Sequence, residues 1–193
     1  MKNIYSNIYK PTNNNLSKAK VAIEKGDVVA IPTETVYGLA ANAYNTKAVK
    51  KIFSLKKRPS NNPLIIHFKN AEQIRKEAVI NKNFLKLVKK FSPGPLTYIL
   101  KKRSSSKISK LANKALATIA VRIPSEKNTI KLLNILNCPL AAPSDGCIPA
   151  FNINVTTIAV VISVYSTPKL NLRIDRANKA TTATGTSLAM IDV

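Results

Sequence analysis

The chain has 193 residues, with 31 lysines and arginines against 9 aspartates and glutamates, so its formal charge is +22. Hydrophobic residues make up 45% of it, which excludes a fully disordered chain, and the length suits one domain with its own core. Cys138 and Cys147 are too few for a disulfide framework and give no zinc signature, so we expect reduced thiols and no metal ligands. The sequence shows no apolar leader and no apolar run of the roughly 20 residues that span a bilayer, so we expect a cytoplasmic protein without membrane contact.

Helical and strand patterns alternate along most of the chain. In the first part of the chain, they predict a helix over 16–25 ended by Gly26, a strand over 27–32, a loop over 33–38 and a helix capped by Thr46. Next come a strand over 64–68, helices over 71–80 and 83–91, and a strand over 96–100. A basic loop over 101–109, a strand over 118–124 and a helix over 126–136 follow. Short strands alternating with helices predict an α/β (α+β) domain with helices packed on a mostly buried sheet.

The composition changes near residue 145. All five glutamates precede residue 127, and the segment beyond 145 is rich in Thr, Ala, Val, Ile, Ser and Asn. Helix signals nearly vanish there, and two strands are predicted, over 155–164 and 186–193. We therefore divide the chain into a domain body, 1–144, and a divergent C-terminal part, 145–193, of the same domain.

Basic residues are spread along the chain and cluster at 47–58, 82–90 and 101–110. No acidic residue falls between Glu34 and Glu72, so this window has a strong positive field. Such a field attracts polyanions such as nucleotides or RNA, although scattered lysines are also typical of a solvated surface. Charge alone indicates an anionic partner without identifying it.

Four basic or titratable residues stand out from the pattern. Lys56 and Arg58, before Pro59, suit a phosphate clamp, but cations also favour the end of a helix. His67 lies inside an apolar strand, where a core histidine satisfied by the backbone is the simplest interpretation. Arg122 lies in an equally apolar strand and needs an anionic partner if buried, either a carboxylate ligand or a structural Asp or Glu.

Several ordered motifs resemble the YrdC/Sua5 (TsaC) family over about residues 14–144. They are Ile31-Pro-Thr-Glu-Thr-Val-Tyr-Gly-Leu39, Lys56-x-Arg58-Pro, Asn62-Pro-Leu-Ile-Ile-His67, Phe91-Ser-Pro-Gly-Pro-Leu-Thr97, Thr118-Ile-Ala-Val-Arg-Ile-Pro124 and Pro139-Leu-Ala-Ala-Pro-Ser144. The resemblance implies a twisted mixed β-sheet flanked by helices, with a concave basic cavity. It also implies a threonylcarbamoyl-AMP synthase, which uses L-threonine, bicarbonate and ATP with Mg²⁺ and serves the t6A modification at position 37 of tRNA.

The resemblance further implies roles for particular residues. Lys56 and Arg58 would be catalytic and would hold the phosphates of ATP. The other residues on the nucleotide side would be Asn62, Thr118 and Ser144. L-Threonine would be held by Thr35, His67, Arg122 and Ala142. The implied partners beyond the substrates are double-stranded RNA or tRNA and the downstream threonylcarbamoyl transferase complex.

The family pattern breaks after Ser144. Gly146 replaces the asparagine of the Ser-x-Asn motif, and Leu188-Ala189 replaces a Ser-Thr pair expected to touch substrate. One hypothesis is a shifted reading frame or a degenerate gene that leaves a non-native tail, and the rival is divergence with the tail still closing the sheet. A catalytically impaired RNA-binding protein or a degenerate product of the same family is therefore the alternative to an active enzyme.

Overall fold

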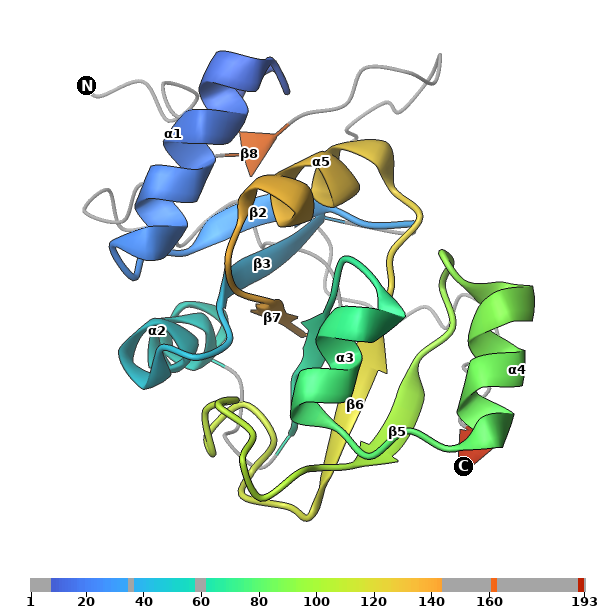
Figure 1. The fold of residues 1–193 in the computed structure, drawn as a ribbon. Helices are drawn as coiled ribbons and strands as arrows, with labels where there is room; N and C mark the ends of the chain where they lie inside the picture. Colours follow the sequence, from blue (N-terminus) through green and yellow to red (C-terminus); the bar gives the residue numbers. More distant parts are fainter. Residues whose placement is uncertain (1–7, 35–36, 58–61, 144–160, 163–190, 193) are drawn as a thin grey trace, which may run out of the picture.

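The structure is a computed structural model that describes residues 8–34, 37–57, 62–143, 161–162 and 191–192. Its elements are β1 (Ile8–Tyr9), α1 (Asn13–Glu24), β2 (Val29–Pro32), β3 (Tyr37–Asn42), α2 (Thr46–Lys56), β4 (Ile65–His67), α3 (Ala71–Glu77), α4 (Lys82–Phe91), β5 (Tyr98–Lys101), β6 (Thr118–Arg122), α5 (Lys127–Ile135), β7 (Leu140–Ala142), β8 (Val161–Ile162) and β9 (Ile191–Asp192). They form one mixed sheet flanked by helices, which confirms the predicted fold class (Figure 1). The predicted boundary at residues 144 and 145 lies outside the described residues and stays a prediction.

The strand order in the sheet is β1-β8-β2-β3-β7-β4-β6-β5-β9. Strands β4 and β6 run parallel, whereas β2–β3, β3–β7, β7–β4 and β6–β5 are antiparallel pairs. The short strands β8 and β9 pair in parallel with β2 and β5, and they fall inside the two strands predicted for the C-terminal part. Most of the sheet is therefore built from residues before 143.

Two helix ends show how the local sequence sets the boundaries. Gly26 lies just past α1, where the sequence predicts the end of the helix, and its φ of +85° is the left-handed conformation that favours glycine there. The prediction that Thr46 caps α2 is wrong. The cap is Asn45, whose side-chain oxygen accepts hydrogen bonds from the backbone N–H groups of Lys47 and Ala48 at 3.0 and 3.2 Å. Asparagine is as good a cap as threonine, and the Thr46 hydroxyl instead bonds Ser109 Oγ at 2.9 Å.

Two strands were not expected from the sequence. The segment taken as a loop runs into β3 at Tyr37, and residues 140–142 form the central strand β7. Strand β7 has only three residues, and the inner residues of both strands, 39–41 and 140–142, are buried on both faces, so they show no alternation of polar and apolar residues. Their strand character follows from pairing with neighbours that the sequence does not specify locally.

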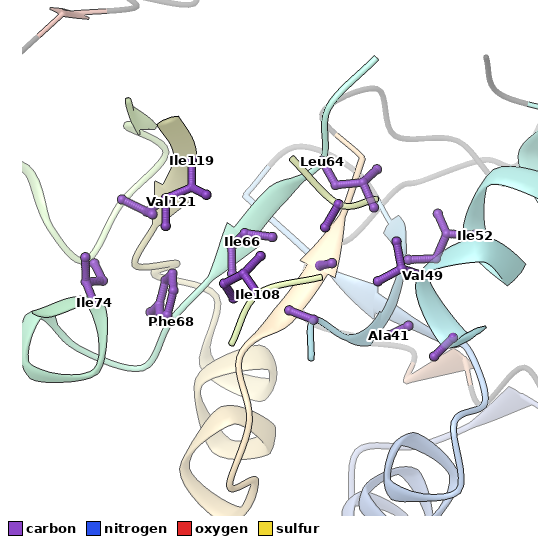
Figure 2. Close-up of a cluster of buried hydrophobic side chains, with 14 of the residues drawn as sticks. Ala41, Val49, Ile52, Leu64, Ile66, Phe68, Ile74, Ile108, Ile119 and Val121 are labelled. Atoms are coloured by element: carbon purple, nitrogen blue, oxygen red, sulfur yellow. The ribbon is translucent and has the colours of Figure 1, made fainter. Parts of the chain in front are cut away.

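One face of the sheet packs on helices α2, α3 and α4. Figure 2 shows this cluster, in which Ile66 of β4 lies near the centre and Val49 and Ile52 approach from α2. Alternate residues of β6, Ile119 and Val121, complete the layer and are 1% and 0% exposed. This face forms the larger apolar core of the molecule.

Helices α1 and α5 cover the opposite face over β2, β3 and β7. Leu16 and Ile23 of α1 pack there with Leu132 of α5. The apolar cluster on this face ends at β7, with Leu140 and Ala142. The next strand across, β4, presents a histidine on the same face, so the core gives way there to polar side chains.

A buried carboxylate ties α3 to the loop after β5. Glu77 is 3% exposed and accepts hydrogen bonds from the hydroxyl groups of Tyr44 and Ser106, both at 2.7 Å, and from the backbone N–H of Lys107 at 2.8 Å. Burial, together with this carboxylate, raises the pKa of Tyr44. The network closes the basic loop against the core.

Replacement of Glu77 by alanine is expected to lower the free energy of unfolding by about 3 kcal/mol, because three donors, from half-buried Tyr44 and Ser106 and from the backbone of Lys107, lose their buried acceptor. Urea unfolding followed by circular dichroism measures the change. Lys76→Ala, on the exposed side of the same helix, is the matched control and should change the value by less than about 0.5 kcal/mol. Equal losses in both variants would contradict a specific role for the buried carboxylate.

Candidate active site

Strand register brings four predicted site residues to one face of the sheet. His67 lies opposite Arg122 on β6 and opposite Leu140 on β7, and Ala142 lies opposite Ile65. Since side chains alternate along a strand, His67, Arg122 and Ala142 share the face away from the larger core. Thr118 is on this face too, four residues before Arg122 and thus about 13 Å away along β6.

The guanidinium group of Arg122 is held at one edge by a buried hydroxyl. Its Nε and Nη2 atoms donate to Thr97 Oγ1 at 3.0 and 2.7 Å, and the Arg122 side chain is 12% exposed. Nη1 lies 3.7 Å from Glu34 Oε2. Burial lowers the pKa of Arg122 and the carboxylate of Glu34 opposes the change, so the group stays a cation at neutral pH.

Glu34 is the structural acid that the sequence left open as a partner for Arg122. Its Oε1 atom accepts hydrogen bonds from the backbone N–H of Ser125 at 2.6 Å and from the Ser125 hydroxyl at 3.2 Å. Its Oε2 atom is buried and accepts no hydrogen bond from the part of the chain that the structure describes. The 3.7 Å separation from Arg122 exceeds hydrogen-bond length. Arg122 Nη1 can therefore still donate a hydrogen bond to a ligand, and Glu34 Oε2 can still accept one.

His67 is buried, as expected, with 2% of its surface exposed. Within the described residues neither ring nitrogen makes a hydrogen bond of good geometry, although the backbone of Ile65 and Leu140 interacts with the ring, so the backbone satisfies it only weakly. Burial, and then the charge of Arg122, lowers its pKa to about 4, while Glu34 and the nearby backbone of Ile65 and Leu140 act in the opposite direction. At neutral pH the ring is uncharged and can donate from one nitrogen and accept at the other.

Unsatisfied polar atoms gather around Arg122. Four buried side-chain atoms lack a hydrogen-bond partner in the described part of the chain, and three of them belong to Glu34 and His67. Buried polar groups are nearly always paired, so such a group of exceptions needs an explanation. A polar ligand that brings both a carboxylate and hydrogen-bond donors would satisfy them.

Of the residues predicted for the nucleotide, Asn62 and Thr118 lie toward the other end of strands β4 and β6. Lys56 is the last residue of α2, and Asn62 precedes β4, level with the start of β6, where Thr118 lies. Lys57 ends α2 in the left-handed conformation, with φ 47°. The predicted residues Thr35, Arg58 and Ser144 lie outside the described residues.

The sequence assigned no role to Glu34, Thr97 or Ser125. Glu34 and Thr97 lie inside motifs noted above, but no periodicity marks them as neighbours of Arg122. They come from three separate loops that the sheet brings together. Only the fold shows that Thr97 and Glu34 contact Arg122 and that Ser125 holds Glu34.

The described residues contain no group of three His, Cys, Asp or Glu side chains that could hold a metal ion. They thus do not form a protein cage for Mg²⁺, which in nucleotide sites is often bound mainly by phosphates and water. In the same part of the chain, no helix has both the length and the apolar character needed to cross a membrane.

A sequence model of the Sua5/YciO/YrdC family, described as "Telomere recombination", matches residues 21–148, more than half of the chain. The chain belongs to this family. It is 46% identical over 123 residues to the threonylcarbamoyl-AMP synthase of Pyrococcus abyssi, across 63% of this chain and 36% of that protein. It is 41% identical over 130 residues to the threonylcarbamoyl-AMP synthase of Bacillus subtilis, across 67% and 37%.

Among solved structures, the chain is similar to Pyrococcus abyssi Sua5 complexed with L-threonine. The TM-score is 0.66 at 41% identity, and the match covers 71% of this chain and 40% of that one. The matched part of this member of the Sua5/YciO/YrdC family therefore covers well under half the length of these relatives.

The low pKa of His67 predicts acid-sensitive stability. Between its ordinary value of 6.5 and the folded value of about 4, the unfolded chain binds a proton that the folded chain does not. Stability therefore falls as the pH drops through this range, by about 2 kcal/mol between pH 7 and pH 5 from this group. Urea unfolding at pH 7 and pH 5 measures this loss of unfolding free energy. His67→Gln should remove the part of the loss that comes from His67. An unchanged pH dependence in the variant would show that other groups cause it.

Proposed function

We propose that this chain is a threonylcarbamoyl-AMP synthase. It would convert L-threonine, bicarbonate and ATP into L-threonylcarbamoyladenylate, pyrophosphate and water. The observation that supports this most is the set of unsatisfied polar atoms on Glu34 and His67 beside a fixed, buried arginine. The similarity to relatives named threonylcarbamoyl-AMP synthase, and to a structure in complex with L-threonine, supports the same substrate.

The threonine end of the site would be built around Arg122. Because Thr97 occupies the Nε edge of the guanidinium, the substrate carboxylate would approach the Nη1 and Nη2 edge. Neutral His67 would hydrogen-bond the amino acid from the same sheet face. By the family resemblance, Thr35 and the Ala142 backbone would complete this end.

The nucleotide end would lie about 13 Å away along β6, at Thr118. Lys56 and Arg58 would hold the phosphates, with Asn62, Thr118 and Ser144 on the same side by resemblance. A separation of this size suits the product, which joins an amino acid to a nucleotide through a carbamate and a phosphate. The two groups of predicted residues would then bind the two ends of one elongated molecule.

The proposed reaction has two steps. The threonine amine would form a carbamate with carbon from bicarbonate, and water would leave. A carbamate oxygen would then attack the α-phosphate of ATP and release pyrophosphate. Lys56 and Arg58 would be the catalytic residues because they would stabilise the negative charge that develops on the phosphates. Mg²⁺ would enter with the phosphates of ATP and neutralise part of their charge.

The proposed setting is the cytoplasm, where the product would pass to the transferase complex that modifies tRNA. RNA contact is supported by the segment between Glu77 and Glu126, which has eleven lysines and arginines and no acidic residue. Lys86, Lys89 and Lys90 of α4 are exposed on this segment. Binding of a tRNA that weakens steeply with salt would support this partner.

Pyrophosphate release by the 193-residue chain tests the function. With ATP and Mg²⁺ present, release should require threonine and bicarbonate together and should stop when either is omitted. Serine, which lacks the methyl group, and valine, which lacks the hydroxyl, are the matched substrate controls. Release that does not depend on threonine, or no release from a folded sample, would contradict the proposal.

A further inference from the structure

The second unsatisfied group beside Arg122 is a carboxylate whose position is fixed. Both hydrogen bonds from Ser125 go to Oε1 of Glu34, one of them from the backbone. The other oxygen, Oε2, is buried and accepts no hydrogen bond from the described residues. The side chain is only 12% exposed, so little water reaches it. Glu34 thus presents one negative oxygen in a set direction.

That oxygen lies where a particular ligand group would meet it. Oε2 is 3.7 Å from Arg122 Nη1, too far for a hydrogen bond but close to the edge that Thr97 leaves open. In an α-amino acid, the amine and the carboxylate are attached to the same carbon atom. A ligand whose carboxylate bonds the open edge of Arg122 can therefore place its amine beside Glu34 Oε2.

We infer that Glu34 is a binding residue for the α-amino group of the amino-acid substrate, acting with Arg122 to recognise both charged ends of that molecule. The inference rests on the proposed function, since it concerns the same substrate. It explains why the ion pair between the buried Glu34 carboxylate and Arg122 stays at 3.7 Å, longer than a hydrogen bond. A carbamate keeps one N–H, so the contact can persist after the amine has reacted.

Threonine and its deaminated analogue separate this role from a purely structural one. (R)-3-Hydroxybutanoate has the carboxylate, the methyl group and the hydroxyl of threonine but no amine. If Glu34 only positioned Arg122, its loss would weaken both ligands equally, because both present the carboxylate. If Glu34 binds the amine, its loss weakens threonine alone.

Isothermal titration calorimetry on the full chain gives the test. The wild-type chain should bind threonine at least about tenfold more tightly than the analogue, since a charge-assisted hydrogen bond is lost. Glu34→Gln keeps the shape and an acceptor for Ser125, and it should lower threonine affinity about tenfold while leaving the analogue within about twofold. Glu72→Gln, an exposed carboxylate on α3, is the matched control and should change neither affinity.

The possible failures are distinguishable. If the wild-type chain binds the analogue as tightly as threonine, the inference is overturned and the proposed function stands. Equal weakening of both ligands in Glu34→Gln would also overturn it and leave Glu34 as a positioning residue. If the wild-type chain binds neither ligand, the threonine site of the proposed function fails and this inference fails with it. The comparison of threonine with its analogue on the wild-type chain tests the inference even if Glu34→Gln does not fold.

Discussion

Replacing Arg122 with alanine should lower threonine-dependent pyrophosphate release by about 100-fold, since a buried, charge-assisted pair of hydrogen bonds to the substrate carboxylate is lost. The effect should appear in the Michaelis constant for threonine more than in that for ATP, because Arg122 lies at the opposite end of β6 from Thr118. Steady-state kinetics with each substrate varied in turn measures it.

Two variants make this result specific. Arg122→Lys keeps the charge but not the planar fork that bonds Thr97 and a carboxylate together, so it should recover only part of the activity. Arg75→Ala removes an exposed arginine from α3 and should have wild-type kinetics. Equal losses in the constants for threonine and ATP would argue that Arg122 supports the fold instead of binding the amino acid.

Ile66→Ala should lower the free energy of unfolding by about 3 kcal/mol, because it leaves a cavity in the apolar core. Ile66 is fully buried in β4, between β7 and β6, at the centre of the larger core (Figure 2). Since a domain of this size has a free energy of unfolding of about 5–15 kcal/mol, the variant should be marginal near body temperature. Urea unfolding at 25 °C gives the value.

Two control variants test whether the loss of unfolding free energy depends on the size of the side chain removed and on its burial. Ile66→Val removes one methylene and should cost about 1 kcal/mol. Val79→Ala changes a side chain that is 48% exposed and should cost less than about 0.5 kcal/mol. If Ile66→Ala lowers the free energy of unfolding no more than Val79→Ala does, Ile66 is not packed in the core as described.

Much of the fold could be predicted because the elements have strong local signals. The helix before Gly26 and the strands around Ile66 and Val121 follow from periodicity and turn residues. The cap of α2 was placed one residue late because asparagine and threonine are neighbours there and both suit the position. Strand β7 was not predicted because its three residues gain their structure from pairing on both sides.

The site was predictable in part for a different reason. His67 and Arg122 stand out as polar residues in apolar strands, and the structure pairs them in register. Glu34 and Thr97 have ordinary loop sequences, and they matter only because the sheet brings them to Arg122. Local sequence patterns report one strand or loop at a time, so contacts between distant loops remain hidden until the fold is known.

Synthesis with ¹³C-labelled bicarbonate tests the central claim most directly. The chain is incubated with threonine, ATP, Mg²⁺ and the labelled bicarbonate, and the products are separated and weighed by mass spectrometry. The account predicts threonylcarbamoyladenylate that is one mass unit heavier than the product from unlabelled bicarbonate and is absent when threonine is omitted. No such product from a folded chain that binds both ATP and threonine would contradict it.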